Sequence, residues 1–162
     1  MIARLIHEQA KFVQAPAGLN TEALLWAIYK CERYVEHAKF PRFEPAYAPD
    51  GIYFKNSELV RREYAKWGNW ACCSYSDFQI MYITAVELGY DGPPLALDRD
   101  VMALPWVVKY LNDRAFARGA KTVEEVADAY NSGTHRNHYK PLEYIAKCRK
   151  YYDRKLEELK SA

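Results

Sequence analysis

The sequence lacks any apolar run of the roughly 20 residues that a membrane-spanning helix requires. Charged side chains appear as early as Arg4 and Glu8, so the N-terminus does not form the apolar part of a secretory signal peptide. We therefore expect no membrane insertion and no signal peptide. Such a protein is made in a cytoplasm, and any substrate outside that cytoplasm must be reached by another route.

Cysteine is scarce, and its spacing argues against two common uses. The four cysteines are Cys31, Cys72, Cys73 and Cys148. None belongs to a CxxC pair, and two are adjacent, so neither a structural zinc site nor a disulfide framework is indicated. We expect free thiols, as in a reducing cytoplasm. His135 and His138 form an HxxH pair without a third ligand at a fitting spacing, so we expect no metal and no other cofactor.

The charge pattern does not favour nucleic-acid binding. The formal net charge is only +2, whereas a nucleic-acid-binding protein concentrates Lys and Arg on one face. The basic residues between 147 and 155 are interleaved with Asp153 and followed by Glu157 and Glu158, which is typical of a solvated helix face. The sequence also has no Gly-rich phosphate loop, no GxSxG elbow and no cysteine in the context of a nucleophile. We expect no nucleic-acid partner.

Apolar and aromatic residues are abundant. The 162 residues are 50% hydrophobic and include 14 Tyr and 4 Trp. This length and composition suit a single domain, residues 1–162, with a substantial core, and we expect a monomer. The aromatic rings either fill that core or line a groove that stacks on sugars, and composition leaves both interpretations open.

Hydrophobic periodicity predicts a mainly α-helical fold. The expected helices lie at about residues 2–13, 20–37, 57–66, 76–89 and 101–115, from 122 to near 133, and in the C-terminal segment. Asn20 is a predicted N-cap. Ser76-x-x-Gln79 and Thr122-x-x-Glu125 have the form of capping boxes.

Two features modify this helical pattern. Prolines and an Asp-Gly pair mark turns in residues 40–55, where segments 42–44 and 52–54 are the predicted strands of one small β-hairpin after the second helix. Pro105 is expected to interrupt the helix around 101–115 or to delay its start. The fold class is therefore mainly α with a small β-hairpin.

Three short strings occur in an informative order. The first is an apolar helical stripe that ends in a carboxylate, Leu25-Ile28-Tyr29-Glu32. The second is Ser-Asp-Phe-Gln-Ile-Met at 76–81, and the third is Ala-Tyr-Asn-Ser-Gly at 129–133. In this order they resemble the lysozyme-like superfamily that cleaves bacterial cell-wall glycan, most closely its goose-type lysozyme and soluble lytic transglycosylase branch. That branch has a catalytic Glu at a helix end, then a Gly-Leu-Met-Gln-like turn into a helix, then Ala-Tyr-Asn-x-Gly. The resemblance covers most of the chain and implies a lysozyme-like α+β fold.

Glu32 is the predicted catalytic residue. It follows Ile28 by four residues and Leu25 by seven, so it lies on the face of the helix that packs. A carboxylate loses solvation where such a face meets a cleft, and its pKa rises as a general acid requires. The resemblance gives Glu32 the role of the acid that protonates the glycosidic oxygen. The alternative is an exposed Glu at a helix end.

Three further charged residues bear on the mechanism. Glu44 is the candidate second carboxylate, which could activate water or stabilise an oxocarbenium ion, and a surface pair with Arg42 is the equal alternative. The family has Ser where this chain has Arg33, which we expect to point to solvent. Asp77 also departs from the family pattern, and we favour a helix-dipole role for it in a first helical turn.

The resemblance also implies a set of substrate-binding residues. Phe78, Gln79 and Met81 match the family turn that packs under the sugar groove, although Gln79 could simply cap a helix. Tyr130 and Asn131 match the family Tyr beside the catalytic Glu and the Asn that faces an acetamido group, with packing and helix capping as the alternatives. Tyr144 resembles a further Tyr that completes the groove, although a lone aromatic at helical spacing is usually core.

These observations favour a phage endolysin-like enzyme that cleaves the β-1,4 bond between N-acetylmuramic acid and N-acetylglucosamine in peptidoglycan. Both hydrolysis, as in lysozyme, and transglycosylation remain open. The partner is then a peptidoglycan glycan strand, met after release from the cell or as part of a virion. The alternative is a non-catalytic lysozyme-like module, either structural in a virion or wall-binding, which Arg33 and the Ser76-Asp77 pair favour.

Overall fold

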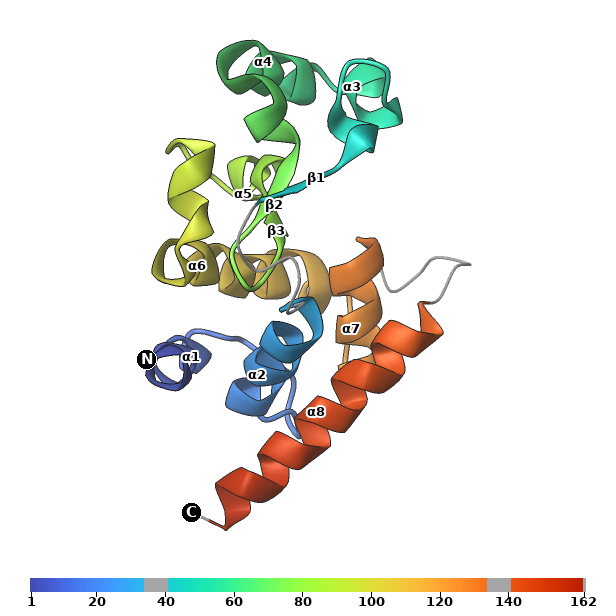
Figure 1. Ribbon diagram of the computed structural model, residues 1–162. Coiled ribbons are helices and arrows are strands. Elements are labelled where there is room, and N and C mark those ends of the chain that lie inside the picture. Colours follow the sequence, from blue (N-terminus) through green and yellow to red (C-terminus); the bar gives the residue numbers. More distant parts are fainter. Residues whose placement is uncertain (34–40, 134–140, 162) are drawn as a thin grey trace. The chain divides into compact units, whose positions relative to one another are not determined.

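The computed structural model describes residues 1–33, 41–133 and 141–161, and its backbone forms mainly helices with one small antiparallel sheet, as predicted (Figure 1). The chain divides into two compact units. The first unit comprises Met1–Glu32 and Val107–Ala162, and the second comprises Arg33–Trp106. Among the described helices, none is both long and apolar enough to cross a membrane.

The first unit is helical. Its helices are α1 (Ile2–Ala10), α2 (Thr21–Glu32), α7 (Val123–Ser132) and α8 (Leu142–Lys160), together with a π-helical turn, η4 (Leu111–Phe116). The long helix α8 packs against both α2 and α7, and α1 packs against α2 (Figure 1). Leu24, Leu25 and Ile28 of α2 are buried, so the apolar stripe that ends at Glu32 is a packing face.

The ends of these helices follow the predicted capping chemistry. The side-chain oxygen of Asn20 accepts a hydrogen bond from the Ala23 N–H at 2.9 Å, which confirms the N-cap of α2. The N–H of Asn20 donates to the Tyr152 hydroxyl at 2.8 Å and so ties the start of α2 to α8. Thr122 and Glu125 form the predicted capping box of α7, which ends at Gly133 in the left-handed conformation.

The second unit mixes short helices with the sheet. Its elements are β1 (Arg42–Phe43), η1 (Pro45–Tyr47), α3 (Ile52–Asn56), α4 (Glu58–Trp67), η2 (Gly68–Cys72), β2 (Cys73–Tyr75), β3 (Ile80–Met81), α5 (Tyr82–Glu87), η3 (Pro94–Asp98) and the first residues of α6 (Asp100–Tyr110). The sheet order is β1-β2-β3, and both pairings are antiparallel. Ser57 caps α4 by accepting from the Val60 N–H at 3.3 Å.

The predicted hairpin is only partly right. Residues 42–43 are a strand, but residues 52–54 belong to helix α3, so β1 pairs instead with β2 through Phe43 and Cys73. Gly51 starts α3 close to the backbone of Ala46, where an added Cβ would lie 2.2 Å from the Ala46 carbonyl oxygen. This close approach, which only glycine permits, turns the chain into a helix rather than a returning strand.

The predicted helix at 76–89 begins later than expected. Residues 76–79 form a turn between β2 and β3, with positive φ angles of 64° at Ser76 and 50° at Gln79, and α5 starts at Tyr82. The Ser76 hydroxyl accepts from the Phe78 N–H at 3.1 Å, and the Ser76 carbonyl accepts from the Gln79 N–H at 3.1 Å. The Ser-x-x-Gln pattern thus stabilises a turn, and the capping-box prediction is wrong there.

Pro105 neither interrupts α6 nor delays its start. The helix begins at Asp100 and runs to Tyr110 with Pro105 inside it. Pro105 lacks the N–H that would pair with the carbonyl of Val101, one turn earlier. Val101 is 50% exposed, so water can take the place of that donor. The exposure also shows that Val101 does not pack in the core, whereas Leu104 and Val108 are buried.

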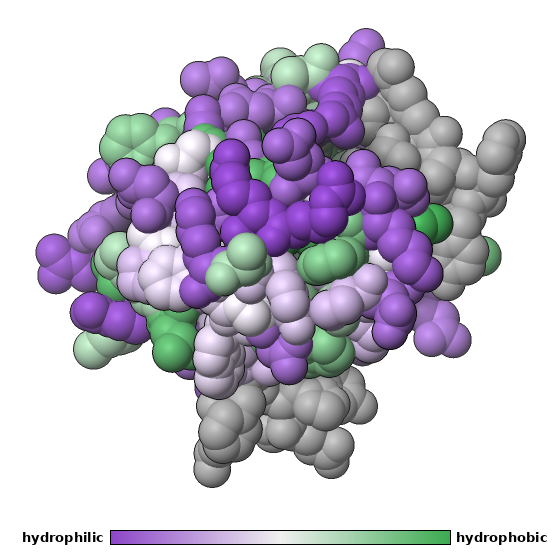
Figure 2. Space-filling model, turned by 90° about the horizontal axis from the view of Figure 1, so that it is seen from above, coloured by the Kyte–Doolittle hydropathy of each residue, from purple (hydrophilic) through white to green (hydrophobic). Residues whose placement is uncertain are grey.

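The core accounts for part of the abundance of aromatic residues. Among the described residues, the buried tyrosines are Tyr29, Tyr75, Tyr82, Tyr90, Tyr110 and Tyr152. Tyr53, Trp67 and Trp70 of the second unit keep 37–50% of their surface exposed. Figure 2 shows that the face over α3 and α4 is mostly hydrophilic, with hydrophobic residues in separate spots. Exposed rings are therefore available for sugar stacking, but they are a minority.

Candidate active site

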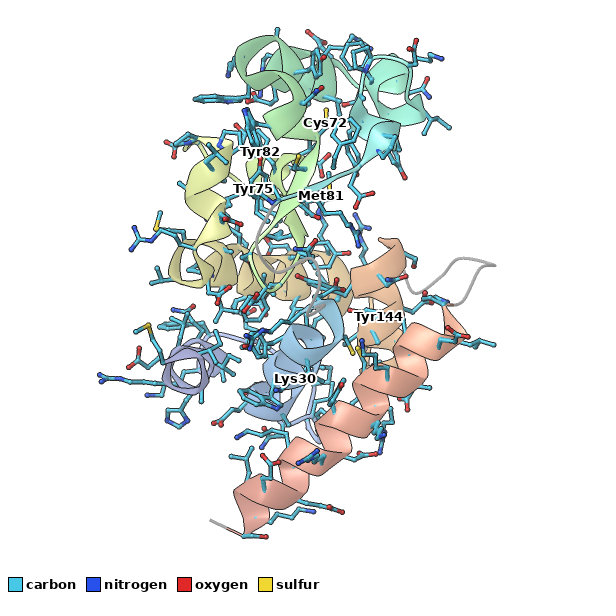
Figure 3. All side chains as sticks on the ribbon, viewed as in Figure 1. Lys30, Cys72, Tyr75, Met81, Tyr82 and Tyr144 are labelled. Atoms are coloured by element: carbon cyan, nitrogen blue, oxygen red, sulfur yellow. The ribbon has the colours of Figure 1, made fainter. Side chains whose placement is uncertain are left out.

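The candidate site is centred on the carboxylate at the end of α2. The hydroxyl of Tyr144 donates a hydrogen bond to Oε1 of Glu32, with an oxygen–oxygen distance of 2.5 Å. Tyr144 lies in the first turn of α8 and projects toward α2 (Figure 3). The two residues are 112 positions apart in the sequence, and the packing of α8 on α2 brings them together. Two helices therefore fix one oxygen of a partly buried carboxylate.

A second tyrosine, Tyr130, is near enough to the same carboxylate for the two groups to interact electrostatically. Burial of the Tyr130 hydroxyl raises its pKa well above the usual range, and the nearby Glu32 carboxylate raises it further. The Tyr130 ring packs edge-on against Tyr110 at a centroid distance of 5.5 Å. The Tyr110 hydroxyl donates to the Ala129 carbonyl at 2.6 Å, which holds this supporting ring in place.

The protonation of Tyr144 is equally well defined. Burial raises the pKa of Tyr144 well above its usual range, and the negative charge of Glu32 acts in the same direction. The hydroxyl therefore keeps its proton at physiological pH and remains the donor to Glu32. Tyr144 also packs, with Ile145 and Tyr151, against the buried residues Cys31, Ala127 and Cys148. The hydrogen bond is thus backed by an apolar cluster that excludes water.

If Glu32 is the catalytic acid that the resemblance implies, Tyr144→Phe should lower the cleavage rate roughly tenfold, the scale of a hydrogen bond to a charged group. The variant keeps the packing of the ring but leaves the carboxyl group of Glu32 less well oriented. Loss of a donor to a carboxylate favours its protonated form, so the pH–rate profile should move to higher pH. The measurement is the rate against pH, with Tyr151→Phe on the same helix as the control. An unchanged profile would show that the Tyr144 hydroxyl does not position Glu32.

The second unit holds the other charged candidate, Glu44. The Arg42 guanidinium donates to Oε1 of Glu44 at 2.5 Å, and the Glu44 side chain is 28% exposed. The Glu44 N–H donates to the Cys72 carbonyl at 2.9 Å next to the pairing of β1 and β2. The structure therefore contains the Arg42–Glu44 pair that the sequence left as one of two alternatives. A catalytic role for Glu44 stays a prediction.

Arg33 and Asp77, the two departures from the family pattern, contact each other. Nε of Arg33 lies 3.5 Å from Oδ2 of Asp77, so Arg33 does not simply point to solvent as predicted. Asp77 lies in the turn after β2 rather than in a first helical turn, so the predicted helix-dipole role is wrong. Its N–H donates to Oδ1 of Asp100 at 3.1 Å. Burial raises the pKa of Asp100, and the negative charge of Asp77 adds to this rise.

The turn that carries the Phe-Gln-Ile-Met string is held by Gln79. Its side-chain amide donates to the Ser76 carbonyl at 2.8 Å, and its side-chain oxygen accepts from the Ser74 hydroxyl at 2.9 Å. Phe78 is fully buried and Met81 is partly exposed. Phe78 is therefore a core residue, and its place under a sugar groove stays a prediction. Substrate contacts of Gln79 and Met81 stay predictions.

The remaining candidates are Asn131, which the structure describes, and two histidines, which it does not. Asn131 is exposed in the last turn of α7, and Gly133 rather than Asn131 takes the left-handed C-cap position. His135 and His138 lie outside the described residues. In residues 1–33, 41–133 and 141–161, no three His, Cys, Asp or Glu side chains gather as a metal site would require. A sugar contact of Asn131 stays a prediction.

Comparisons of the chain with protein-family models, curated proteins and solved structures found no match. The resemblance therefore rests on the three strings and on the geometry around Glu32. Sequence reasoning found Glu32, Tyr130 and Tyr144, which the structure brings together in the first unit. It missed Tyr110, because nothing in the spacing of the sequence indicates that the Tyr110 hydroxyl bonds to the carbonyl of Ala129.

Proposed function

We propose that this protein cleaves the β-1,4 bond between N-acetylmuramic acid and N-acetylglucosamine in peptidoglycan, with Glu32 as the general acid and then the base. One observation carries the proposal. The carboxylate at the end of a buried helical stripe accepts a hydrogen bond from Tyr144 and interacts electrostatically with the nearby Tyr130. The family resemblance implies a Tyr beside its catalytic Glu, which Tyr130 matches, and a further Tyr that completes the groove, which Tyr144 matches.

The arrangement suits both steps of glycosidic cleavage. Protonated Glu32 gives its proton to the leaving oxygen as the bond breaks, and the resulting carboxylate then takes a proton from the attacking nucleophile. The Tyr144 hydroxyl holds Oε1 in one place throughout, because its raised pKa keeps it protonated. It also stabilises the ionised form that Glu32 must adopt between the two steps.

Two mechanisms share this chemistry and differ in the nucleophile. A hydrolase uses water, usually held by a second carboxylate, and leaves a reducing muramic acid end. A lytic transglycosylase uses the 6-hydroxyl of the muramic acid itself and leaves a 1,6-anhydro end. The Phe-Gln-Ile-Met and Ala-Tyr-Asn strings favour the second. The ion pair between Arg42 and Glu44 also supports transglycosylation, since the pair gives Glu44 a role that requires no water.

We expect Glu44→Gln to reduce the cleavage rate by less than about tenfold, well below the loss of a general base. The amide keeps the shape of the side chain and still accepts from Arg42, although the ion pair is lost. The wild-type products should carry anhydro ends, lighter by one water than reducing ends. Rates and product masses are measured together, with Arg42→Gln as the matched control. Reducing ends with an inactive Glu44→Gln would instead identify Glu44 as the group that holds water.

The rival function is a lysozyme-like module that binds the wall or a virion without catalysis. Its support in the sequence is the presence of Arg33 and Asp77 where the family has other residues. The contact between these two side chains gives them a structural role within the second unit, so neither residue argues against catalysis. Turnover decides between the functions, because an enzyme releases many glycan ends per molecule and a binding module releases none.

A further inference from the structure

Two cysteines from opposite ends of the chain meet in the first unit. The sulfur of Cys148 on α8 lies 2.7 Å from the sulfur of Cys31 on α2, across 117 positions of sequence. Both side chains are buried, with exposures of 1% for Cys148 and 7% for Cys31. Both thiols are free in the structure. The other two cysteines bond elsewhere, since Cys72 donates to the Tyr47 carbonyl and Cys73 donates to the Asn69 carbonyl.

This geometry points to a modification site: we infer that Cys31 and Cys148 close to an intramolecular disulfide when the protein meets a disulfide oxidant. A disulfide needs its sulfurs about 2.05 Å apart on elements whose Cβ atoms face each other. Sulfurs 2.7 Å apart on two packed helices need only a small shift to satisfy this. Cys72 and Cys73 are adjacent in the chain, at the end of η2 and the start of β2, and their thiols donate to the carbonyls of different residues, so they are poorly placed for such a bond.

The reaction is a pair of thiol–disulfide exchanges. The Cys31 thiolate attacks one sulfur of a small disulfide, RSSR, and one RS⁻ leaves with the formation of a mixed disulfide. The Cys148 sulfur then attacks the Cys31 sulfur, and the second RS⁻ leaves. The two protein thiols lose two electrons and two protons in total, and the oxidant is reduced to two RSH.

The burial of the pair predicts how the reaction proceeds. Cys31 is the more exposed thiol and takes the first step. The contact with Cys31 and burial together raise the pKa of Cys148, so Cys148 stays protonated until the mixed disulfide forms. Exchange should be slow in the folded protein, where α8 covers the site, and fast during refolding.

The bond would connect the same two helix segments that hold the candidate catalytic pair. Cys31 precedes Glu32 directly, and Cys148 lies one helical turn after Tyr144. Closing the bond would therefore secure the segment of α2 that carries Glu32 to the segment of α8 that carries Tyr144. This consequence for catalysis rests on the proposed function, whereas bond formation does not, so the chemical test below stands even if the protein is not a glycosidase.

The test is refolding from urea with a mixture of oxidised and reduced glutathione, next to refolding under dithiothreitol. The reduced protein should titrate with four thiols. The oxidised protein should titrate with two, lose the mass of two hydrogen atoms and yield a cross-linked peptide that contains Cys31 and Cys148. Its thermal midpoint should rise by on the order of 10 °C, because the link closes a long loop.

Variants make the assignment specific. Cys31→Ser and Cys148→Ser should each keep three titratable thiols after oxidation and show no rise in midpoint, whereas Cys72→Ser should behave like the wild type with one thiol fewer. Four thiols after oxidative refolding would overturn the inference, as would a cross-link that involves Cys72 or Cys73.

Discussion

Replacement of Glu32 by Gln is expected to lower the rate of peptidoglycan cleavage by at least about a hundredfold, the lower end of typical losses of a general acid. An amide at this position cannot give a proton to the leaving oxygen or take one from the nucleophile. The side chain keeps its shape, and its carbonyl oxygen still accepts the hydrogen bond from Tyr144 that the carboxylate accepts in the wild type. The fold should therefore survive while the activity is lost.

The measurement compares the rate of glycan-end release by Glu32→Gln with that of the wild type, together with the circular dichroism and thermal midpoint of both. Glu143→Gln is the matched control, because Glu143 is an exposed carboxylate in the same turn of α8 as Tyr144. It should retain the wild-type rate. Near-wild-type cleavage by Glu32→Gln would remove Glu32 from the mechanism.

Replacement of Phe78 by Ala is expected to lower the free energy of unfolding by about 3–5 kcal/mol, the usual cost of deleting a buried aromatic ring. Phe78 has no exposed surface, and its N–H is held by the Ser76 hydroxyl in the turn between β2 and β3. The deletion leaves a cavity beneath that turn. Urea titration of the wild type and the variant measures the difference.

Phe43→Ala is the control for this prediction, since Phe43 lies on β1 of the sheet whose β2 and β3 are joined by the turn that carries Phe78, but is 44% exposed. Phe43→Ala should lower the free energy of unfolding much less than Phe78→Ala, because little of the Phe43 side chain is removed from water on folding. Equal costs for the two substitutions would mean that Phe78 is not a core residue. A Phe78 variant that stays folded but loses activity would indicate that the turn shapes a groove above it.

Helix ends were predictable wherever the determining chemistry was local. Asn20 and the Thr122–Glu125 box cap α2 and α7 as predicted, because each cap depends only on residues within one turn. The same rule failed at Ser76-x-x-Gln79, where the Ser76 hydroxyl accepts from the Phe78 N–H and the Gln79 side-chain amide donates to the Ser76 carbonyl within a hairpin turn. Residues with positive φ there are compatible with the turn but not with a helix start, and sequence pattern does not distinguish the two.

Contacts between distant segments were not predictable from local pattern. The partner of β1 is β2, about thirty residues later in the chain, and the predicted partner segment became α3 because Gly51 packs against Ala46. Within the site, helical periodicity placed Glu32 on the packing face of α2. Its neighbours Tyr130 and Tyr144 were indicated only by the family resemblance, and no spacing rule joins Cys31 to Cys148.

Mass spectrometry of the soluble fragments released from purified peptidoglycan tests the central claim most directly. The wild type should release disaccharide-peptides cut between N-acetylmuramic acid and N-acetylglucosamine, with muramic ends in the anhydro form, and Glu32→Gln should release almost none. Soluble fragments cut at an amide or peptide bond, or no soluble fragments at all from the wild-type protein, would contradict the assignment of a glycan-cleaving site at Glu32.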